Sequence, residues 1–295
     1  MAGGKLSAPF EERFGEIQGS RLRYFVGGDG DPLVLVHGLG GGAANWGELA
    51  SPLARRRRVL VPDLPGHGGS DALPAAPTLA AYADRVVKLF ELEGMAPAPI
   101  VGHSFGGTVA LRAAIRRPEL VSGVVLAAGA GISSGRRMAQ ATLFASGIVR
   151  PGRLAARFRR QIARSAAARR LVFGGWGVTD PDSLPARAVE GFLAPQEVHA
   201  DTWSAGRALV LEDPRTELDL VRCPCLVLWG ARDATVPLAD GFEYARRLRA
   251  PLRVIADCGH LLIAERPEAC LDAIEALLDR VRELEELPLQ GKALG

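Results

Sequence analysis

The stretch APIVGHSFGGTVALRAA, residues 98–114, decides the fold of this chain. Its first four residues form an apolar run that is typical of a buried strand, and the residues after Gly106 have helical character. A strand that turns directly into a helix at a serine puts Ser104 in a strained backbone conformation and raises its hydroxyl above the sheet. The flanking Gly102 and Gly106 let the helix pass close to neighbouring strands, where a Cβ would clash. The start of the helix also directs backbone N–H groups at the same point, which favours developing negative charge.

Strand and helix signals alternate over most of the chain. Two alternating segments, 13–17 and 21–26, predict a pair of antiparallel strands. Thr78 is the predicted N-cap of a helix that runs to Leu92. The pattern indicates the α/β class, with a mostly parallel sheet of eight strands that is covered by helices on both faces. The other expected elements are the strand at the start of 98–114, strands at 32–36, 59–61, 121–128, 226–229 and 253–255, and a helix over 269–287.

Five blocks occur in an order that resembles the α/β-hydrolases. They are LVLVHGLG (33–40), VPDLPGHGGSD (61–71), GHSFGG (102–107), LVLWGARD followed by VP (226–233 and 236–237), and DCGH (257–260). The resemblance implies the α/β-hydrolase fold, in which loops at the carboxyl ends of the strands hold the chemistry.

The pattern changes between about Ile132 and Asp219, where strand signals stop and alanine-rich helical segments begin. In the α/β-hydrolases an inserted helical cap occupies that position. We therefore expect residues 1–131 and 220–295 to form the core, and residues 132–219 to form a cap over the active site.

Ser104 resembles the nucleophile of these enzymes, and such a serine needs a base and a third group that orients the base. The resemblance assigns the base to His260, after a strand and a Cys-Gly turn, and the orienting acid to Asp233 at a strand end. Asp257 is a rival for the acid. Some relatives take the acid from the strand after the nucleophile helix, but residues 127–131 contain no carboxylate.

The other four histidines have structural interpretations. His37 ends the oxyanion strand and is expected to bond to the backbone, and His67 lies in a Pro-Gly-His-Gly-Gly turn. His103 adjoins the nucleophile and is expected to point elsewhere, and His199 lies in the expected cap.

The resemblance also assigns an oxyanion hole and a substrate pocket. The backbone N–H groups of Leu39 and Phe105 are the expected donors, and two such donors stabilise a tetrahedral oxyanion by several kcal/mol. Trp46 and Phe144 are expected to contact the substrate. Packing in the core is the alternative for Trp46.

A serine at position 104 limits the reaction class. Haloalkane dehalogenases and epoxide hydrolases carry an aspartate at this position, so acyl transfer to water remains. The first interpretation is a serine hydrolase, carboxylesterase-like, that cleaves a small-molecule ester or lactone through an acyl-enzyme at Ser104. The alternatives are a carbon–carbon bond hydrolase of the meta-cleavage product type, a cofactor-free perhydrolase, and a non-catalytic binding protein of the same fold. The block at residues 37–46 is similar to carbon–carbon bond hydrolases, but Leu261 stands where those enzymes usually have tryptophan.

Residues 135–170 include ten arginines and no acidic residue. Three interpretations remain open: a solvated face, a face that receives an anionic substrate, and a face that contacts anionic lipid. The helical spacing of the arginines predicts a basic helix with an adjacent apolar stripe: Arg153, Arg157, Arg160 and Arg164 beside Leu154, Phe158 and Ile162.

Bulk composition excludes several classes. The 295 residues carry a formal net charge of +3, and the excess of arginine over lysine fits a GC-rich bacterial genome. No apolar run approaches the length of a membrane span, and the first residues lack a secretory signal, so a cytoplasmic location is expected. The four cysteines show no disulfide or zinc spacing. No cofactor, metal ion or nucleic acid is expected.

Overall fold

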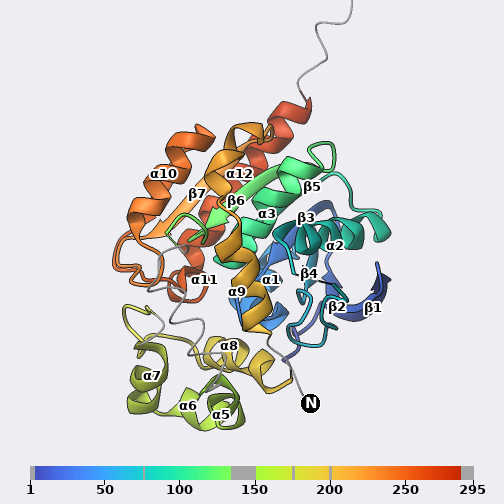
Figure 1. Ribbon diagram of the computed structural model, residues 1–295. Coiled ribbons are helices and arrows are strands. Elements are labelled where there is room, and N and C mark those ends of the chain that lie inside the picture. Colours follow the sequence, from blue (N-terminus) through green and yellow to red (C-terminus); the bar gives the residue numbers. More distant parts are fainter. Residues whose placement is uncertain (1–3, 76, 134–150, 175–176, 199–200, 287–295) are drawn as a thin grey trace, which may run out of the picture.

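The computed structural model describes residues 4–75, 77–133, 151–174, 177–198 and 201–286, and this part of the chain contains one sheet of eight strands (Figure 1). The strands lie in the order β1-β2-β4-β3-β5-β6-β7-β8. β2 is antiparallel to both of its neighbours, and the strands from β4 to β8 along the sheet are parallel. The predicted α/β class with a mostly parallel eight-stranded sheet is therefore confirmed. The bounds are β1 Glu11–Ile17, β2 Ser20–Gly27, β3 Asp31–Val36, β4 Arg57–Pro62, β5 Ala98–His103, β6 Val121–Ala127, β7 Cys225–Gly230 and β8 Leu252–Ile255.

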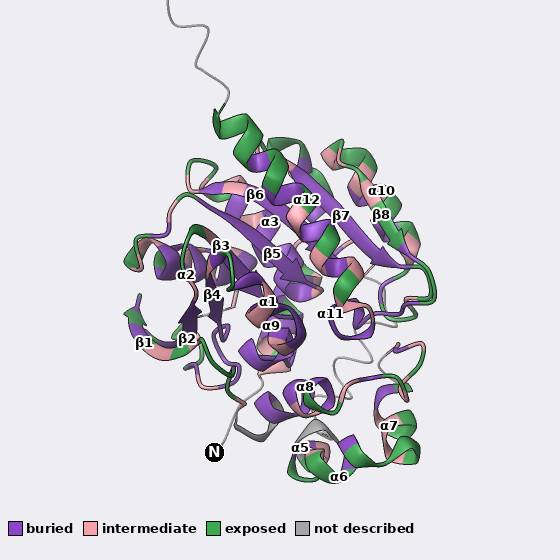
Figure 2. Ribbon diagram, turned by 180° about the vertical axis from the view of Figure 1, so that it is seen from behind, coloured by how far each residue is buried: buried purple, intermediate pink, exposed green. Residues whose placement is uncertain are grey.

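Helices cover both faces of the sheet, which is why its central strands are buried throughout or nearly so (Figures 1 and 2). The Thr78 hydroxyl accepts a hydrogen bond from Ala81 N at 3.1 Å, which confirms the predicted N-cap. Within the described ranges, no helix combines the length and apolar character that a bilayer crossing requires. One face carries α2 (Leu79–Leu92), α3 (Phe105–Arg116) and α10 (Leu238–Leu248), and the other carries α1 (Gly47–Leu53) and α12 (Pro267–Glu286).

Within the described residues between β6 and β7, the regular elements are all helices. α5 to α8 lie beyond the carboxyl ends of the strands, with α8 against the short helix η1 (Ala43–Trp46) (Figure 1). The helices are α5 Pro151–Arg157, α6 Arg159–Arg164, α7 Ala166–Phe173, α8 Ala186–Val198 and α9 Thr202–Leu211.

The prediction of one basic helix with an apolar stripe is wrong. The chain leaves the helical conformation at Phe158, and Ser165 begins α7 by accepting a hydrogen bond from Ala168 N at 3.3 Å. Ile162 is buried, whereas Leu154 and Phe158 are 66% and 48% exposed. Both α5 and α6 pack on α8, but the residues of the stripe are not all on the buried side of these helices.

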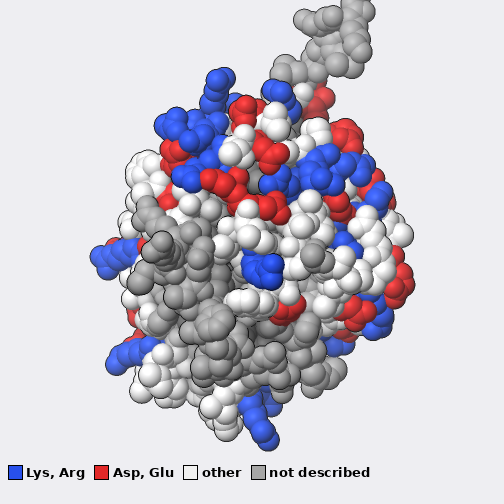
Figure 3. Space-filling model, viewed as in Figure 1, with Lys and Arg blue, Asp and Glu red and all other residues white. Residues whose placement is uncertain are grey.

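The described arginines of this segment favour a solvated face. Arg157, Arg160 and Arg164 are exposed, and basic side chains project from the lower end of the molecule, where α5 to α7 lie (Figure 3).

Candidate active site

The turn between β5 and α3 holds Ser104 in a conformation that L-residues rarely adopt, with φ 53° and ψ −118°. A Cβ on Gly102 would lie 2.3 Å from the Gly106 carbonyl oxygen, and one on Gly106 would lie 2.2 Å from that of Val36. The two glycines are therefore required by the close approach of α3 to β5 and β3, as the sequence predicts. The strained turn leaves the Ser104 side chain partly exposed at the carboxyl edge of the sheet.

His260 follows β8 and lies beside this serine. Its Nε2 is 3.1 Å from Ser104 Oγ, and its Nδ1 is 2.8 Å from Asp233 Oδ2. A carboxylate can only accept, so Nδ1 carries the proton and Nε2 is left to accept the serine proton. The structure thus brings together three side chains from the ends of β5, β7 and β8.

Asp233 is held by the backbone that follows it. Its Oδ1 accepts hydrogen bonds from the N–H groups of Thr235 and Val236, both at 2.8 Å, and its side chain is fully buried. The rival Asp257 is 64% exposed and pairs with Arg232 at 2.6 Å. Asp233 is therefore the carboxylate that faces His260.

The other described histidines bond to the main chain. His37 donates from Nδ1 to the Gly38 carbonyl at 2.8 Å and accepts from Leu64 N at 2.9 Å. His67 Nδ1 lies 3.0 Å from the Pro65 carbonyl, and His103 Nε2 lies 2.8 Å from the carbonyl of His260. Burial lowers the pKa of His37 to about 4, and that of both His67 and His103 to about 3. All three are neutral at pH 7, and His199 lies outside the described residues.

The role of Leu39 and Phe105 as the donors of an oxyanion hole stays a prediction. Phe105 is the first residue of α3, and the first N–H groups of a helix lack a partner within the helix. Leu39 lies in a turn closed by a 3.1 Å hydrogen bond from Gly41 N to the Gly38 carbonyl. A Cβ on Gly38 would lie 3.2 Å from Ser104 Cβ, so this turn borders the serine.

Two residues, Trp46 and Phe144, are expected to contact the substrate, and the structure describes only the first of them. Trp46 has no exposed surface and belongs to the hydrophobic core, which favours the packing alternative, and its contact with substrate stays a prediction. Its position in η1 between the sheet and α8 accounts for the burial. Phe144 lies outside the described residues.

The sequence did not predict that two residues, His103 and Glu265, would hold the histidine loop. His103 bonds to the carbonyl of His260, and Glu265 accepts a hydrogen bond from Gly259 N at 3.1 Å. Glu265 is the single acidic residue at the end of the apolar run 261–264, and this interruption is the signal that points to it.

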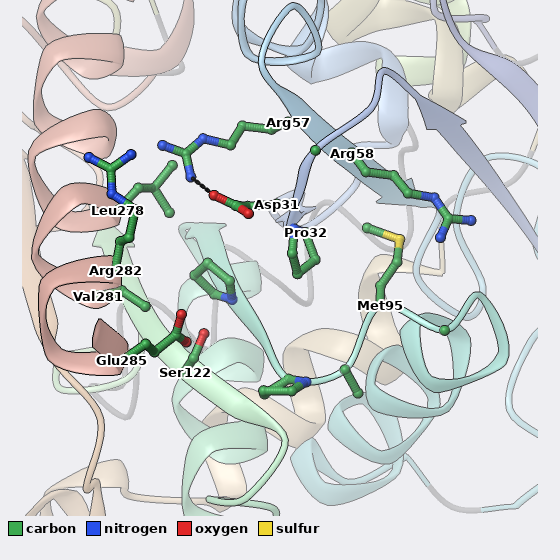
Figure 4. Close-up of a pocket in the computed structure, with 15 residues that line it drawn as sticks. Asp31, Pro32, Arg57, Arg58, Met95, Ser122, Leu278, Val281, Arg282 and Glu285 are labelled. Atoms are coloured by element: carbon green, nitrogen blue, oxygen red, sulfur yellow. Dashed lines mark hydrogen bonds and ion pairs between the residues drawn. The ribbon is translucent and has the colours of Figure 1, made fainter. Parts of the chain in front are cut away.

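A cavity of about 370 Å³ lies at the opposite edge of the sheet (Figure 4). It is lined by Asp31 and Arg57, the first residues of β3 and β4, whereas Ser104 and His260 follow the last residues of their strands. Arg57 pairs with Asp31 at 3.3 Å and with Glu275 at 3.1 Å. Its charge is therefore already compensated, and the cavity is separate from the candidate site.

Metal-ligating side chains do not gather in groups of three or more anywhere in the described ranges. The chemistry that this site can perform with its own residues is nucleophilic attack by a serine that a histidine deprotonates.

Known proteins are similar to this chain in both sequence and fold. Residues 33–273 match the model of the alpha/beta hydrolase family. The chain is 34% identical over 261 residues to a pimeloyl-[acyl-carrier protein] methyl ester esterase of Aromatoleum aromaticum, a match that covers 82% of this chain and 96% of the relative. It is 39% identical over 119 residues to a 2-hydroxymuconate semialdehyde hydrolase of a Pseudomonas species, covering 39% of this chain and 42% of the relative.

Solved structures show the same likeness. The crystal structure of a membrane phospholipase A, described as a bacterial virulence factor, is 26% identical with a TM-score of 0.71. The match covers 92% of this chain and 87% of that one. The chain belongs to the alpha/beta hydrolase family.

Proposed function

We propose that this protein is a serine hydrolase that cleaves a carboxylic ester or lactone through an acyl-enzyme at Ser104. The observation that carries the proposal is the continuous chain of hydrogen bonds from Ser104 Oγ to His260 Nε2, at 3.1 Å, and from His260 Nδ1 to Asp233 Oδ2, at 2.8 Å. These distances are within the reach that proton transfer from the serine requires.

Attack begins when Ser104 Oγ bonds to the carbonyl carbon of the substrate and its proton passes to His260 Nε2. The imidazolium is stabilised by Asp233, whose side chain has no exposed surface and keeps the ring in one tautomer. Collapse of the tetrahedral intermediate expels the alcohol, which takes the proton from His260. A water molecule then repeats these steps on the acyl-enzyme and releases the acid.

The N–H groups of Leu39 and Phe105 are the proposed donors to the tetrahedral oxyanion. Support comes from Gly38, whose close approach to Ser104 brings the turn that contains Leu39 to the serine. Donors fixed in the backbone need no reorganisation as charge develops on the oxygen.

Ester chemistry is favoured by the methyl ester esterase of Aromatoleum aromaticum, a relative whose match covers 82% of this chain. The second candidate is hydrolysis of a carbon–carbon bond in a meta-cleavage product. It is favoured by the 39% identity over 119 residues to 2-hydroxymuconate semialdehyde hydrolase. Leu261 after the histidine, buried in the core, argues for the ester.

We further propose that residues 132–219 act as a cap over this site. Two observations support it: α8 packs against η1 beyond the carboxyl ends of the strands, and the Gly177 carbonyl accepts a hydrogen bond from His260 N at 2.8 Å. A small-molecule substrate would then enter between this segment and the sheet.

The test is hydrolysis of p-nitrophenyl acetate, butyrate and octanoate by the wild type and by Ser104→Ala. Removal of the nucleophile should lower kcat by more than about 10⁴-fold. A fluorophosphonate should label the wild type and leave Ser104→Ala unlabelled.

The matched control is Ser122→Ala, because Ser122 lines the cavity at the other edge of the sheet (Figure 4). It should retain wild-type turnover. Equal turnover by the wild type and Ser104→Ala would refute the proposal. Turnover of a meta-cleavage product without turnover of any ester would select the second candidate.

A further inference from the structure

Glu265 is a buried carboxylate that takes no part in the proposed chemistry. It ends α11 (Leu262–Glu265), five residues after His260, and is 6% exposed. Burial raises the pKa of Glu265, against the opposing effects of hydrogen bonds from Thr179 N and Gly259 N and of the Arg266 charge. Burying an ionisable group is costly, so the contacts of this one indicate what it does.

The carboxylate joins two segments that are far apart in the sequence. Its Oε2 accepts a hydrogen bond from Thr179 N at 2.8 Å, and Thr179 lies between α7 and α8. Both of its oxygens accept from Gly259 N, at 3.1 and 3.2 Å. Gly259 immediately precedes His260, so one side chain ties the histidine loop to the segment inserted between β6 and β7.

The same two segments also touch directly, backbone to backbone. The Gly177 carbonyl accepts from His260 N at 2.8 Å, and a Cβ on Gly259 would lie 1.9 Å from that carbonyl oxygen. His103 Nε2, from the core side, lies 2.8 Å from the carbonyl of His260. The main chain of the histidine is therefore held from both sides, and Glu265 fixes the residue before it.

We propose that Glu265 is a positioning residue for His260: it clamps the histidine loop against residues 177–179, so that the imidazole reaches both Ser104 and Asp233. The inference rests on the proposed serine hydrolase function. Displacement of a reacting group by about 1 Å can lower the rate about 100-fold. Loss of the clamp should therefore lower kcat and leave substrate binding nearly unchanged.

The experiment compares Glu265→Leu with Glu265→Gln at a temperature well below the Tm of both. The leucine removes every acceptor, and we expect kcat for p-nitrophenyl butyrate to fall about 10- to 100-fold, with KM within about 3-fold. The fluorophosphonate labelling rate of Ser104 should fall in parallel. The glutamine keeps one oxygen, which can take the place of Oε2 and accept from both N–H groups, so kcat should stay within about 3-fold of the wild type.

Glu48→Leu is the matched control, because Glu48 is also buried and also joins the core to the inserted segment. It lies in α1 and pairs with Arg187 of α8, and within the described residues it makes no hydrogen bond or ion pair with the histidine loop. Glu48→Leu should lower the Tm and retain wild-type kcat. Glu265→Asp is the second variant in case Glu265→Leu does not fold, because its shorter carboxylate cannot reach both donors and should lower kcat.

Wild-type kcat and labelling in both Glu265→Leu and Glu265→Asp would overturn the inference alone, as would an equal loss of kcat in Glu48→Leu. A wild-type protein without labelling at Ser104 would overturn the inference together with the proposed function. Reduced kcat and labelling in Glu265→Leu, with recovery in Glu265→Gln, is the result that we expect.

Discussion

The carboxyl edge of the sheet and the outer helices of the inserted segment hold their side chains in different ways. At the edge, the Asp233 carboxylate has no exposed surface and three hydrogen bonds, and Ser104 stands between glycines that leave no room for a Cβ. In α5 to α7, the large side chains of Leu154 and Leu171 are 66% and 84% exposed. One region is fixed by backbone contacts, and the other presents much of its side-chain surface to solvent.

This difference indicates where a substitution should matter. A side chain held by main-chain donors cannot adapt when its chemistry changes, because its partners do not move. A side chain in solvent loses little when it is replaced. Paired substitutions, one in each region, can test whether the loss of activity or stability differs between the regions as the contacts suggest.

Among the paired substitutions, the largest effect is expected for Asp233→Asn. Oδ1 accepts from Thr235 N and Val236 N, so the amide oxygen of asparagine must take that position and its NH₂ must face His260. The ring would then carry its proton on Nε2 and could not accept the proton of Ser104. In serine proteases this change of tautomer costs about 10⁴ in kcat, and we expect a similar loss in p-nitrophenyl ester hydrolysis.

Asp182→Asn is the partner variant in the inserted segment. Asp182 is partly exposed and pairs with Arg170. Exposed ion pairs contribute little, so kcat should change by less than about 2-fold. A loss of kcat below about 10-fold in Asp233→Asn would contradict the difference between the two regions. It would also contradict the orienting role of the Asp233 carboxylate.

The next effect is on stability and compares two glycines. Gly106→Ala would put a Cβ 2.2 Å from a carbonyl oxygen of β3, which cannot move without the sheet, and we expect a loss of at least about 4 kcal/mol. Gly174→Ala meets nothing within 4 Å at a helical φ of −59° and should stabilise the fold by about 0.4–1 kcal/mol. Urea unfolding measures both, and similar values for the two variants would contradict the contrast.

The smallest effect concerns pH. Burial lowers the pKa of His67 to about 3, below its ordinary value of 6.5, so the unfolded chain binds the proton first as the pH falls. The neutral histidine therefore supports the fold above pH 6.5, and that support is lost as the pH falls toward 3. Between pH 7 and pH 5 this one group should cost about 2 kcal/mol.

His67→Asn isolates that contribution, because the other titrating groups are the same in both proteins. Its free energy of unfolding should fall by about 2 kcal/mol less than that of the wild type between pH 7 and pH 5. Equal falls would mean that His67 titrates normally. His67 lies in the loop that follows β4, outside the inserted segment.

The elements of the core could be predicted because their signals are local. Apolar runs predict the strands, and Thr78 marks the start of α2 with its own hydroxyl. The proximity of Ser104, Asp233 and His260 also follows from topology, because parallel strands end at one edge of the sheet.

Contacts between distant segments could not be predicted from local patterns. Thr179 and Glu265 are 86 residues apart, and no periodicity relates them. Trp46 was ambiguous because an aromatic side chain beside the oxyanion loop suits a pocket as well as a core, and the packing of α8 that buries it is a long-range contact. The break at Phe158 was missed because the spacing of the arginines continues across it.

The turn between β5 and α3 has a consequence for the design of variant libraries. Its strain resides in the main chain of Ser104, whose φ is 53°, and the neighbouring main chain approaches through Gly102 and Gly106. Another small nucleophile at position 104 inherits the same geometry without a new backbone clash, whereas either glycine tolerates no addition. A search for new reactions should therefore randomise position 104 and keep Gly102 and Gly106. The backbone strain at this turn does not depend on which reactive side chain position 104 carries.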